Sequence, residues 1–387
     1  MLAGAVTLWA SQEKAMQRDE SVVDEALPHP ARQSEFDWIF MVGAPRSGST
    51  WLQLMLGSHP HIVTGQESQV FSEYVAPLHE RWRRELTYPD SELVRQHGIA
   101  PYLSEAEFLG LLRGFVRGVV RGSVRQKPEA HYFLEKSPSS TFHIPLIHRC
   151  FPETAFIHIV RDGRDVAASL LHAAQSWGRD WAPGNMREAA RLWSESVRAA
   201  RGAALLTERF IEVRYEDLLL NTTAELERLA AFLGITWSST ELERVKNTFR
   251  FEKLSLQRHS ADVFKNTGAR HASGTSERRE PPGFFGKGKA GRWQESLTQR
   301  QLEVFDWVAG ELLVELGYTS PAERHGSGWL PRLEVSLEET LQSCKQRLKA
   351  GLVARPPSTP RTTPQPSVGA QPDAAGVATR SQASCSL

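Results

Sequence analysis

Residues 36–56 read FDWIFMV-GAPRSGST-WLQLML, a mostly apolar run, a turn rich in glycine and serine, and a second apolar run. The first run is typical of a buried strand, and the second has the apolar spacing of a helix. The stretch therefore predicts a strand, a tight loop and a helix. Its Gly-x4-Gly loop can point backbone N–H groups at an anion such as a phosphate.

The same order of elements recurs along the chain. Residues 131–134, 154–160 and 210–214 are apolar runs that predict further strands, and residues 165–174 have helical spacing. Strands alternating with helices, without an internal repeat, predict an α/β fold with a central parallel sheet flanked by helices. In such sheets ligands bind at the carboxyl ends of the strands.

The loop lacks the lysine of a nucleoside triphosphatase, because Ser49 stands at that position. Arg46 supplies a cation, and Ser47, Ser49 and Thr50 supply hydroxyl donors, so the loop still suits an anion. A structural turn without a ligand is the alternative for the loop taken alone. The other segments must decide between the two.

A second candidate phosphate-binding segment, VRDGRDVAAS, spans residues 160–169. Arg161 stands at the predicted strand end and Ser169 lies eight residues on, so both side chains can grip a second phosphate. A helix start with Asp162 and Asp165 in its first turn is the alternative. Because this segment occurs in the same chain as the Gly-rich loop, a phosphate site is favoured over a simple helix start.

The composition points to an ordinary globular protein. The 387 residues are 40% hydrophobic, and 46 basic against 45 acidic residues leave a net charge of +1, which gives no global field for nucleic acid. Cys150, Cys344 and Cys385 form neither a disulfide framework nor a metal-ligand set, which favours a reducing compartment. No window of about 18 apolar residues predicts a membrane span, so we expect a cytoplasmic protein.

The chain divides by composition into four parts. We expect a flexible N-terminal segment at 1–34, a catalytic domain at 35–320, a helical appendage at 321–350 and a disordered tail at 351–387. The tail is rich in Pro, Ser, Thr, Ala and Gln and has no aromatic residues. The sequence carries no signal for an oligomeric state.

Taken in order, APRSGSTWL at 44–52 and VRDGRDVAAS at 160–169 resemble the two cofactor signatures of the sulfotransferase family. The resemblance implies the P-loop-containing nucleotide-hydrolase-like sulfotransferase fold, with 3′-phosphoadenosine-5′-phosphosulfate as sulfuryl donor and no required metal. It implies contacts to the 5′-phosphosulfate from Arg46, Ser47, Gly48, Ser49 and Thr50, contacts to the 3′-phosphate from Arg161 and Ser169, and stacking of Trp51 on the adenine.

Two shorter motifs resemble later elements of the family. RYEDL at 214–218 implies that Tyr215 lies near the adenine edge, and NTF at 247–249 implies that Phe249 forms part of the adenine wall. Together the motifs extend the resemblance over about residues 37–316.

The segment FGKGKAGRW resembles the loop that closes over the 3′-phosphate in this family. The resemblance implies contacts from Lys287 and Gly288. Gly286 stands where the family has an arginine, which removes one charged contact. Lys289 or Arg292 can supply the missing charge.

Sulfuryl transfer needs a group that takes the acceptor's proton and a positive charge on the leaving oxygen. Many cytosolic members use a histidine two residues after a lysine, but here Pro138 follows Lys136 at that spacing. Members that act on tyrosine in proteins instead have a glutamate 21 residues after the loop arginine, where this chain has Glu67. The resemblance implies Glu67 as general base, and a solvated glutamate at a helix start is the alternative. Lys136 follows a predicted strand, so its ammonium can lie beside the loop and stabilise the leaving oxygen together with Arg46, and a surface lysine is the alternative.

Several alternatives stay open at this point. His59, His61 or His143 can serve as the base, because histidine titrates in the useful range. The chain can also be a divergent P-loop kinase or hydrolase that uses ATP and Mg²⁺, or a non-catalytic nucleotide-binding protein. The acceptor can be a small molecule, a glycan, a lipid or a peptide.

Overall fold

The computed structural model describes residues 36–87, 98–251, 253, 284 and 288–324. Contacts divide the chain into a unit at 1–332 and a unit at 333–387. All the described residues belong to the first unit.

The domain limits expected from composition stay predictions. The segment 1–34, the tail 351–387 and all but the first four residues of the appendage 321–350 lie outside the described residues. The expected cytoplasmic location also stays a prediction. Within the described ranges, no helix is long and apolar enough to cross a bilayer.

The described residues form one five-stranded sheet in the order β2-β3-β1-β4-β5, and all of its pairs are parallel. The strands are β1 (Asp37–Val42), β2 (Ile62–Thr64), β3 (Tyr132–Glu135), β4 (Ala155–Val160) and β5 (Phe210–Arg214). The predicted α/β fold with a central parallel sheet is thus confirmed. The sequence did not predict β2, because three residues between two turns are too few to show a pattern.

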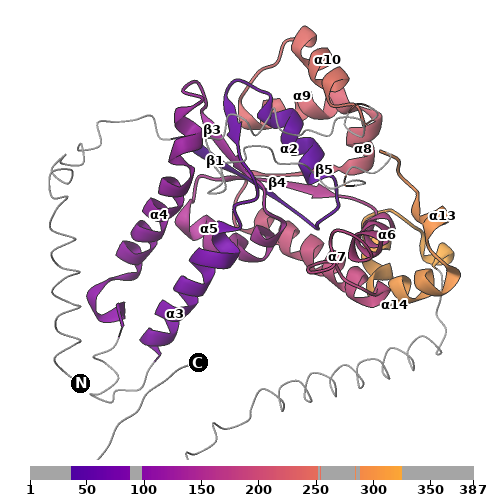
Figure 1. The fold of residues 1–387 in the computed structure, drawn as a ribbon, viewed down its shortest axis with the longest axis horizontal. Helices are drawn as coiled ribbons and strands as arrows, with labels where there is room; N and C mark the ends of the chain where they lie inside the picture. The colour runs from indigo at the N-terminus through magenta and orange to yellow at the C-terminus, as the bar shows by residue number, and fades with distance from the viewer. Residues whose placement is uncertain (1–35, 88–97, 252, 254–283, 285–287, 325–387) are drawn as a thin grey trace, which may run out of the picture. The chain divides into compact units, whose positions relative to one another are not determined.

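Alternate residues of β1 enter two different cores, as a strand covered on both faces requires. Ile39 and Met41 pack with one group of helices, whereas Trp38, Phe40 and Val42 pack with another. Figure 1 shows helices on both sides of the sheet. This explains why the sequence of β1 is almost continuously apolar.

The first core lies against α2 (Ser49–Gly57), α8 (Tyr215–Leu220), α9 (Thr222–Leu233) and α10 (Ser239–Thr248). The second core involves η1 (Phe71–Val75), α3 (Ala76–Leu86), α4 (Glu105–Arg125), α5 (Ile144–Cys150) and η4 (Gly202–Leu205). A third joins α6 (Gly163–Ala174), α7 (Met186–Arg201) and α14 (Gln299–Glu315). The remaining short elements are η2 (Ala100–Tyr102), η3 (Pro138–His143), α13 (Trp293–Ser296) and η6 (Pro321–Glu323).

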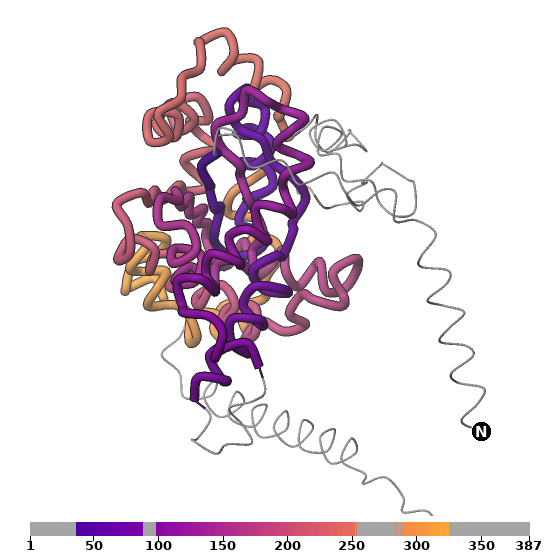
Figure 2. The backbone as a smooth tube through the Cα atoms, turned by 90° about the vertical axis from the view of Figure 1, so that its left-hand side faces the viewer, coloured from indigo at the N-terminus to yellow at the C-terminus, as the bar shows by residue number. Residues whose placement is uncertain are grey.

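Figure 2 views the chain after a quarter turn, with the α9 and α10 region in salmon at the upper end of the described part. The helices α8, α9 and α10, which follow β5, pack on the opposite face of the sheet from α3 and α4, whereas α7, after β4, reaches the core of α3 and α4 through Ala200. The strand ends between these groups of helices carry the candidate site.

Candidate active site

Parallel strands end at the same edge of a sheet, so the segments that follow them meet there. β1 leads into the loop 43–48, β3 into Lys136, β4 into Arg161 and β5 into Tyr215. The turn after β2 carries Glu67. The structure thus gathers at one edge the segments in which the sequence predicted the functional residues.

Two glycines give the loop its close packing. Gly43 has φ +136°, and a Cβ there would lie 2.5 Å from the carbonyl oxygen of Ile159. Gly48 has φ +98°, and its Cβ would lie 2.6 Å from Cδ2 of Tyr215. Thr141 fixes the start of the loop, because its Oγ1 accepts a hydrogen bond from the N–H of Gly43 at 2.8 Å. Only glycine fits both positions without strain.

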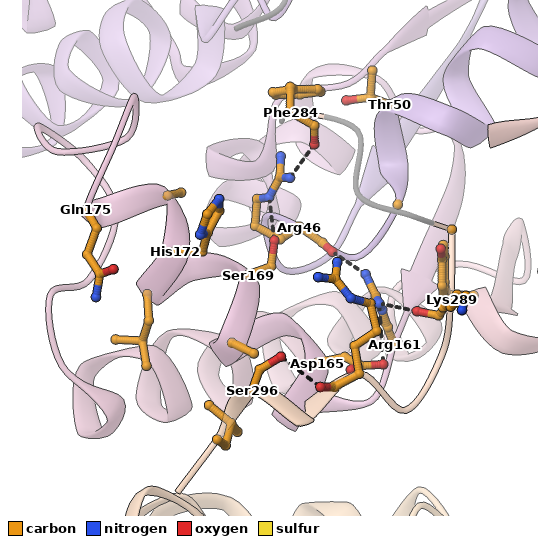
Figure 3. A pocket seen from close by; sticks show the side chains of 18 of the residues that line it. Arg46, Thr50, Arg161, Asp165, Ser169, His172, Gln175, Phe284, Lys289 and Ser296 are labelled. Atoms are coloured by element: carbon orange, nitrogen blue, oxygen red, sulfur yellow. Dashed lines mark hydrogen bonds and ion pairs between the residues drawn. The ribbon is translucent and has the colours of Figure 1, made fainter. Parts of the chain in front are cut away.

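Arg46 joins the two predicted phosphate-binding segments. Its Nε donates to Oγ of Ser169 at 3.0 Å, and its Nη2 donates to the carbonyl oxygen of Phe284 at 2.6 Å, as Figure 3 shows. The guanidinium also lies over the Trp177 ring, with Cζ 5.1 Å from the ring centroid. Its backbone has φ 73°, a costly conformation for a residue other than glycine, so the surroundings must hold it in place.

Arg161 places a second cation beside the loop. Its Nη1 donates to the carbonyl oxygen of Arg46 at 3.4 Å, and its Nη2 donates to that of Lys289 at 3.1 Å. Its Cζ lies 4.2 Å from the centroid of the Tyr215 ring. Arg161 thereby connects the loop, the first residue of α8 and the late segment around Lys289.

Asp165 anchors that late segment to α6, a role that the sequence did not reveal. The carboxylate accepts from the N–H groups of Gly291 at 2.8 Å and Trp293 at 2.9 Å, and it pairs with Arg161 at 3.3 Å. The sequence could have predicted the pair with Arg161, which lies one helical turn earlier. It could not predict the bonds to Gly291 and Trp293, which lie more than 120 residues away in the chain. The alternative of a simple acidic first turn is therefore incomplete.

Glu67 and Lys136 form an ion pair between the turn after β2 and the end of β3. Nζ of Lys136 also donates to Oγ1 of Thr50 at 3.2 Å. The Lys136 side chain is 4% exposed and that of Glu67 is 30% exposed. The predicted base and the predicted catalytic lysine are therefore in contact. The lysine also contacts Thr50, the last residue of the stretch GAPRSGST at 43–50.

The predicted adenine-binding residues form an aromatic corner. Nε1 of Trp51 donates to the carbonyl oxygen of Phe249 at 2.8 Å, and its ring lies 5.9 Å from Tyr215 and 4.6 Å from Phe251, measured between centroids. Burial raises the pKa of Tyr215, so its hydroxyl stays neutral. Phe251, which the sequence did not single out, lines the cavity, whereas Phe249 does not.

A cavity of about 920 Å³ lies over this edge of the sheet. Nine of the predicted residues line it: Arg46, Gly48, Ser49, Thr50, Trp51, Arg161, Ser169, Tyr215 and Gly288. Lys289 and Arg292, which follow Gly286 by three and six residues in the sequence, line it as well. Lys287 lies outside the described residues.

Two buried donor atoms in the predicted phosphate-binding segments suit an anionic ligand. In the described part of the chain, Oγ of Ser47 and Nε of Arg161 are buried and have no hydrogen-bond partner. Buried polar groups are rarely left unpaired, so these two atoms fit a site that a ligand completes. No cluster of three or more metal-ligating side chains occurs within the described ranges.

Two of the histidines considered as alternative bases lie away from Glu67. His59 and His61 precede β2 and therefore lie at the opposite edge of the sheet. Burial lowers the pKa of His59, whose Nδ1 accepts from the N–H of His61 at 3.0 Å. Burial also lowers the pKa of His143, and His143, like Glu67 and Lys136, is not among the residues that line the cavity.

The fold and the site define an α/β protein with a Gly-rich loop after its central strand and cationic side chains, Lys136 and Arg161, after β3 and β4. A profile of the sulfotransferase family matches residues 38–239, just over half of the chain. The chain belongs to the sulfotransferase family, as the two signatures predicted. This membership does not favour the alternative that uses ATP and Mg²⁺.

The chain is 26% identical to protein-tyrosine sulfotransferase 2 of Gallus gallus over 211 residues, which is 54% of each chain. It is 25% identical to protein-tyrosine sulfotransferase 1 of Danio rerio over 206 residues, 53% of this chain and 55% of the relative. The match thus spans about half the length of these curated relatives.

Two solved structures are also similar to this chain. The sulfotransferase domain from the curacin biosynthetic pathway has 18% identity and a TM-score of 0.42, and the match covers 72% of this chain and 98% of that domain. A mouse sulfotransferase complexed with PAP has 16% identity and a TM-score of 0.44, with 78% of this chain and 90% of the other covered.

Proposed function

We propose that this chain is an enzyme that moves the sulfuryl group of 3′-phosphoadenosine-5′-phosphosulfate to an acceptor hydroxyl or amine by in-line transfer, with Glu67 as general base. One observation carries the proposal: the ammonium of Lys136 contacts both Glu67 and Thr50, and Thr50 lies at the start of α2 directly after the loop 43–48. The proposed base and the proposed leaving-group cation thus lie side by side next to the proposed phosphate-binding loop, an arrangement that suits sulfuryl transfer. Membership of the sulfotransferase family supports it.

The donor supplies a sulfuryl group carried on a phosphate oxygen, and the lining of the cavity fits its two anionic ends. The residues assigned to the 5′-phosphosulfate are Arg46, Ser47, Gly48, Ser49 and Thr50. Arg161 and Ser169 are assigned to the 3′-phosphate, with added positive charge from Lys289 and Arg292 at the same cavity. Trp51, Tyr215 and Phe251 offer the adenine an aromatic wall.

In the proposed step, Glu67 takes the proton of the acceptor as the acceptor atom bonds to sulfur. Lys136 donates to the bridging oxygen, which receives the electron pair of the breaking sulfur–oxygen bond. The ion pair seen in the structure must open for this, because the ammonium has to leave Glu67 for the oxygen. A bound phosphosulfate beside Thr50 offers Lys136 that second partner.

The names of the relatives narrow the choice of acceptor. Both are protein-tyrosine sulfotransferases, so a tyrosine hydroxyl in a peptide is the acceptor class to test first. Hydroxyls of small molecules, glycans and lipids are the comparison classes. Transfer of labelled sulfuryl to a tyrosine peptide, and not to the same peptide with phenylalanine, would support this assignment.

The donor site is tested by thermal unfolding with adenosine 3′,5′-bisphosphate, with ADP, and with ATP plus Mg²⁺. A ligand at 100 times its Kd stabilises the folded state by about 2.7 kcal/mol. We expect stabilisation by the bisphosphate without metal, lost in Arg161→Ala and Ser169→Ala and kept in Arg198→Ala, an exposed arginine on α7. Stabilisation only by ATP with Mg²⁺ would contradict the proposed donor.

A further inference from the structure

The buried carboxylate of Glu135 has no part in the chemistry above. This last residue of β3 is 2% exposed, and it accepts hydrogen bonds from the hydroxyls of Ser68 at 2.9 Å, Ser137, and Ser140 at 3.2 Å. Burial raises the pKa of Glu135, while these hydroxyls and the ammonium of Lys136 oppose the shift. A buried carboxylate is costly unless it is hydrogen-bonded, so the serines make this position tenable.

Glu135 and Lys136 are neighbours at the end of a strand, so their side chains point to opposite faces of the sheet. The turn after β2 matches this arrangement residue by residue. Glu67 pairs with Lys136, and the next residue, Ser68, donates to Glu135. Two adjacent contacts therefore tie the turn that carries the proposed base to the end of β3.

The same network holds a strained turn. Gln69 has φ 48°, in the left-handed region that a residue other than glycine enters at a cost of roughly 1–3 kcal/mol. Its N–H donates to Oγ of Ser137 at 3.0 Å, and that hydroxyl donates to Glu135. Such a conformation persists only where its surroundings fix it. Here the fixing contacts come from Ser137 and, through Ser68, from Glu135.

We propose that Glu135 is a positioning residue for Glu67: through Ser68 and Ser137 it fixes the turn after β2 and so directs the Glu67 carboxylate toward Lys136 and the acceptor. The inference rests on the proposed function, because it acts through the proposed base. A shift of about 1 Å in a reacting group can cost about 100-fold in rate, so a network that sets this turn matters for catalysis.

The test compares two serines that donate to the same carboxylate. Ser68→Ala removes the contact next to Glu67, whereas Ser140→Ala removes one in η3, away from that turn. Release or transfer of labelled sulfuryl from the donor is measured, with a tyrosine peptide or water as acceptor. We expect kcat to fall at least tenfold in Ser68→Ala and less than twofold in Ser140→Ala, with unchanged binding of the bisphosphate in both.

A double-mutant cycle separates positioning from a general structural effect, since residues that act through one another are not additive. In a Glu67→Gln background, Ser68→Ala should cause no further loss of kcat. Ser68→Thr, which keeps a hydroxyl, should restore most of the activity lost in Ser68→Ala. Additive losses, or equal losses in Ser68→Ala and Ser140→Ala, would overturn the positioning role of Glu135 and leave the proposed function standing. Unchanged turnover in Glu67→Gln would remove the proposed base and the inference together.

Discussion

At the scale of single residues, Oε1 of Glu67 accepts a hydrogen bond from Nζ of Lys136, which also donates to Oγ1 of Thr50. Glu67→Gln keeps the size of the side chain and its ability to accept from Lys136, but it removes the base. We therefore expect kcat to fall about 10²–10⁴-fold, the usual contribution of a general base, with unchanged stabilisation by the bisphosphate. Initial rates with labelled donor measure the first quantity and thermal unfolding the second.

The matched control is Glu73→Gln, an exposed glutamate on η1. Its turnover should equal that of the unaltered protein. A comparable loss in both variants would mean that the effect of Glu67→Gln is not specific to the site.

Some residues of the site could be predicted from the sequence and others could not. Arg46 and Ser169 were predicted because each lies in a compact signature, and the structure joins them by a hydrogen bond. Glu135 and Asp165 were missed because the contacts that give them a role, from Ser68 to Glu135 and from Gly291 and Trp293 to Asp165, come from distant parts of the chain. A buried carboxylate gains its role from those partners, which local spacing does not show.

At the scale of elements, the start of α6 depends on a close approach that only glycine allows. A Cβ at Gly163 would lie 2.5 Å from Cδ2 of Trp193 and 2.6 Å from Cζ of Phe305. Gly163→Ala should therefore cost about 1–3 kcal/mol, the usual penalty for overpacking a core. The midpoint of urea unfolding measures it.

The control lies in α4, where a Cβ at Gly118 would meet no atom within 4 Å. Gly118→Ala should stabilise the protein by about 0.5–1 kcal/mol, because alanine restricts the unfolded chain and favours the helix. A loss of stability in Gly118→Ala, or none in Gly163→Ala, would contradict the packing described here.

The segment after residue 288 depends on α6 through Asp165. Asp165→Asn removes the charge that pairs with Arg161 and weakens the bonds to the N–H groups of Gly291 and Trp293. Hydrogen bonds to charged groups contribute about 1.5–3 kcal/mol, so we expect the Kd for the bisphosphate to rise roughly tenfold or more. Isothermal titration calorimetry measures the change.

Loss of a negative charge beside the proposed 3′-phosphate site acts in the opposite direction, because it removes repulsion of the phosphate. Tighter binding in Asp165→Asn would thus show that repulsion outweighs anchoring. Glu295→Gln is the control, because it removes an exposed carboxylate from the neighbouring α13 and should leave the Kd unchanged.

Elements were predictable where the pattern was long. Residues 210–214 were predicted as a strand and form β5, and the strand predicted at 154–160 forms β4 one residue later. The helix predicted from Asp165 begins two residues earlier, because Oδ1 of Asp162 accepts from the N–H of Arg164 and caps the helix. A cap of this kind extends a helix beyond its apolar pattern.

At the scale of the whole molecule, a buried polar network makes stability depend on pH. Nδ1 of His158 lies 3.0 Å from Oε2 of Glu212, which also accepts from Nε of Arg201 at 2.8 Å. Burial alone would raise the pKa of Glu212, but Arg201 and His158 outweigh it and lower the pKa to about 2. Burial lowers the pKa of His158 despite the neighbouring carboxylate.

Both shifts act in the same direction. His158 is neutral in the folded state, so stability falls as the pH drops below 6.5, its ordinary pKa. Glu212 contributes stability above pH 4.5 that is lost between pH 4.5 and about 2. The urea midpoint should decline from pH 7.5 to 5.0 and again toward pH 3, with the second decline reduced in Glu212→Gln. A midpoint that rises with acidity would contradict this.

The order of the strands has a consequence for how this chain can evolve. The anion loop follows the central strand β1, with Glu67 and Lys136 after β2 and β3 on one flank and Arg161 and Tyr215 after β4 and β5 on the other. Under the proposed function, the flank with Glu67 carries the general base, and the flank with Arg161 and Tyr215 binds the nucleotide. A lineage can therefore exchange its base, or adopt a new acceptor, by mutations confined to one flank while it inherits the nucleotide site unchanged.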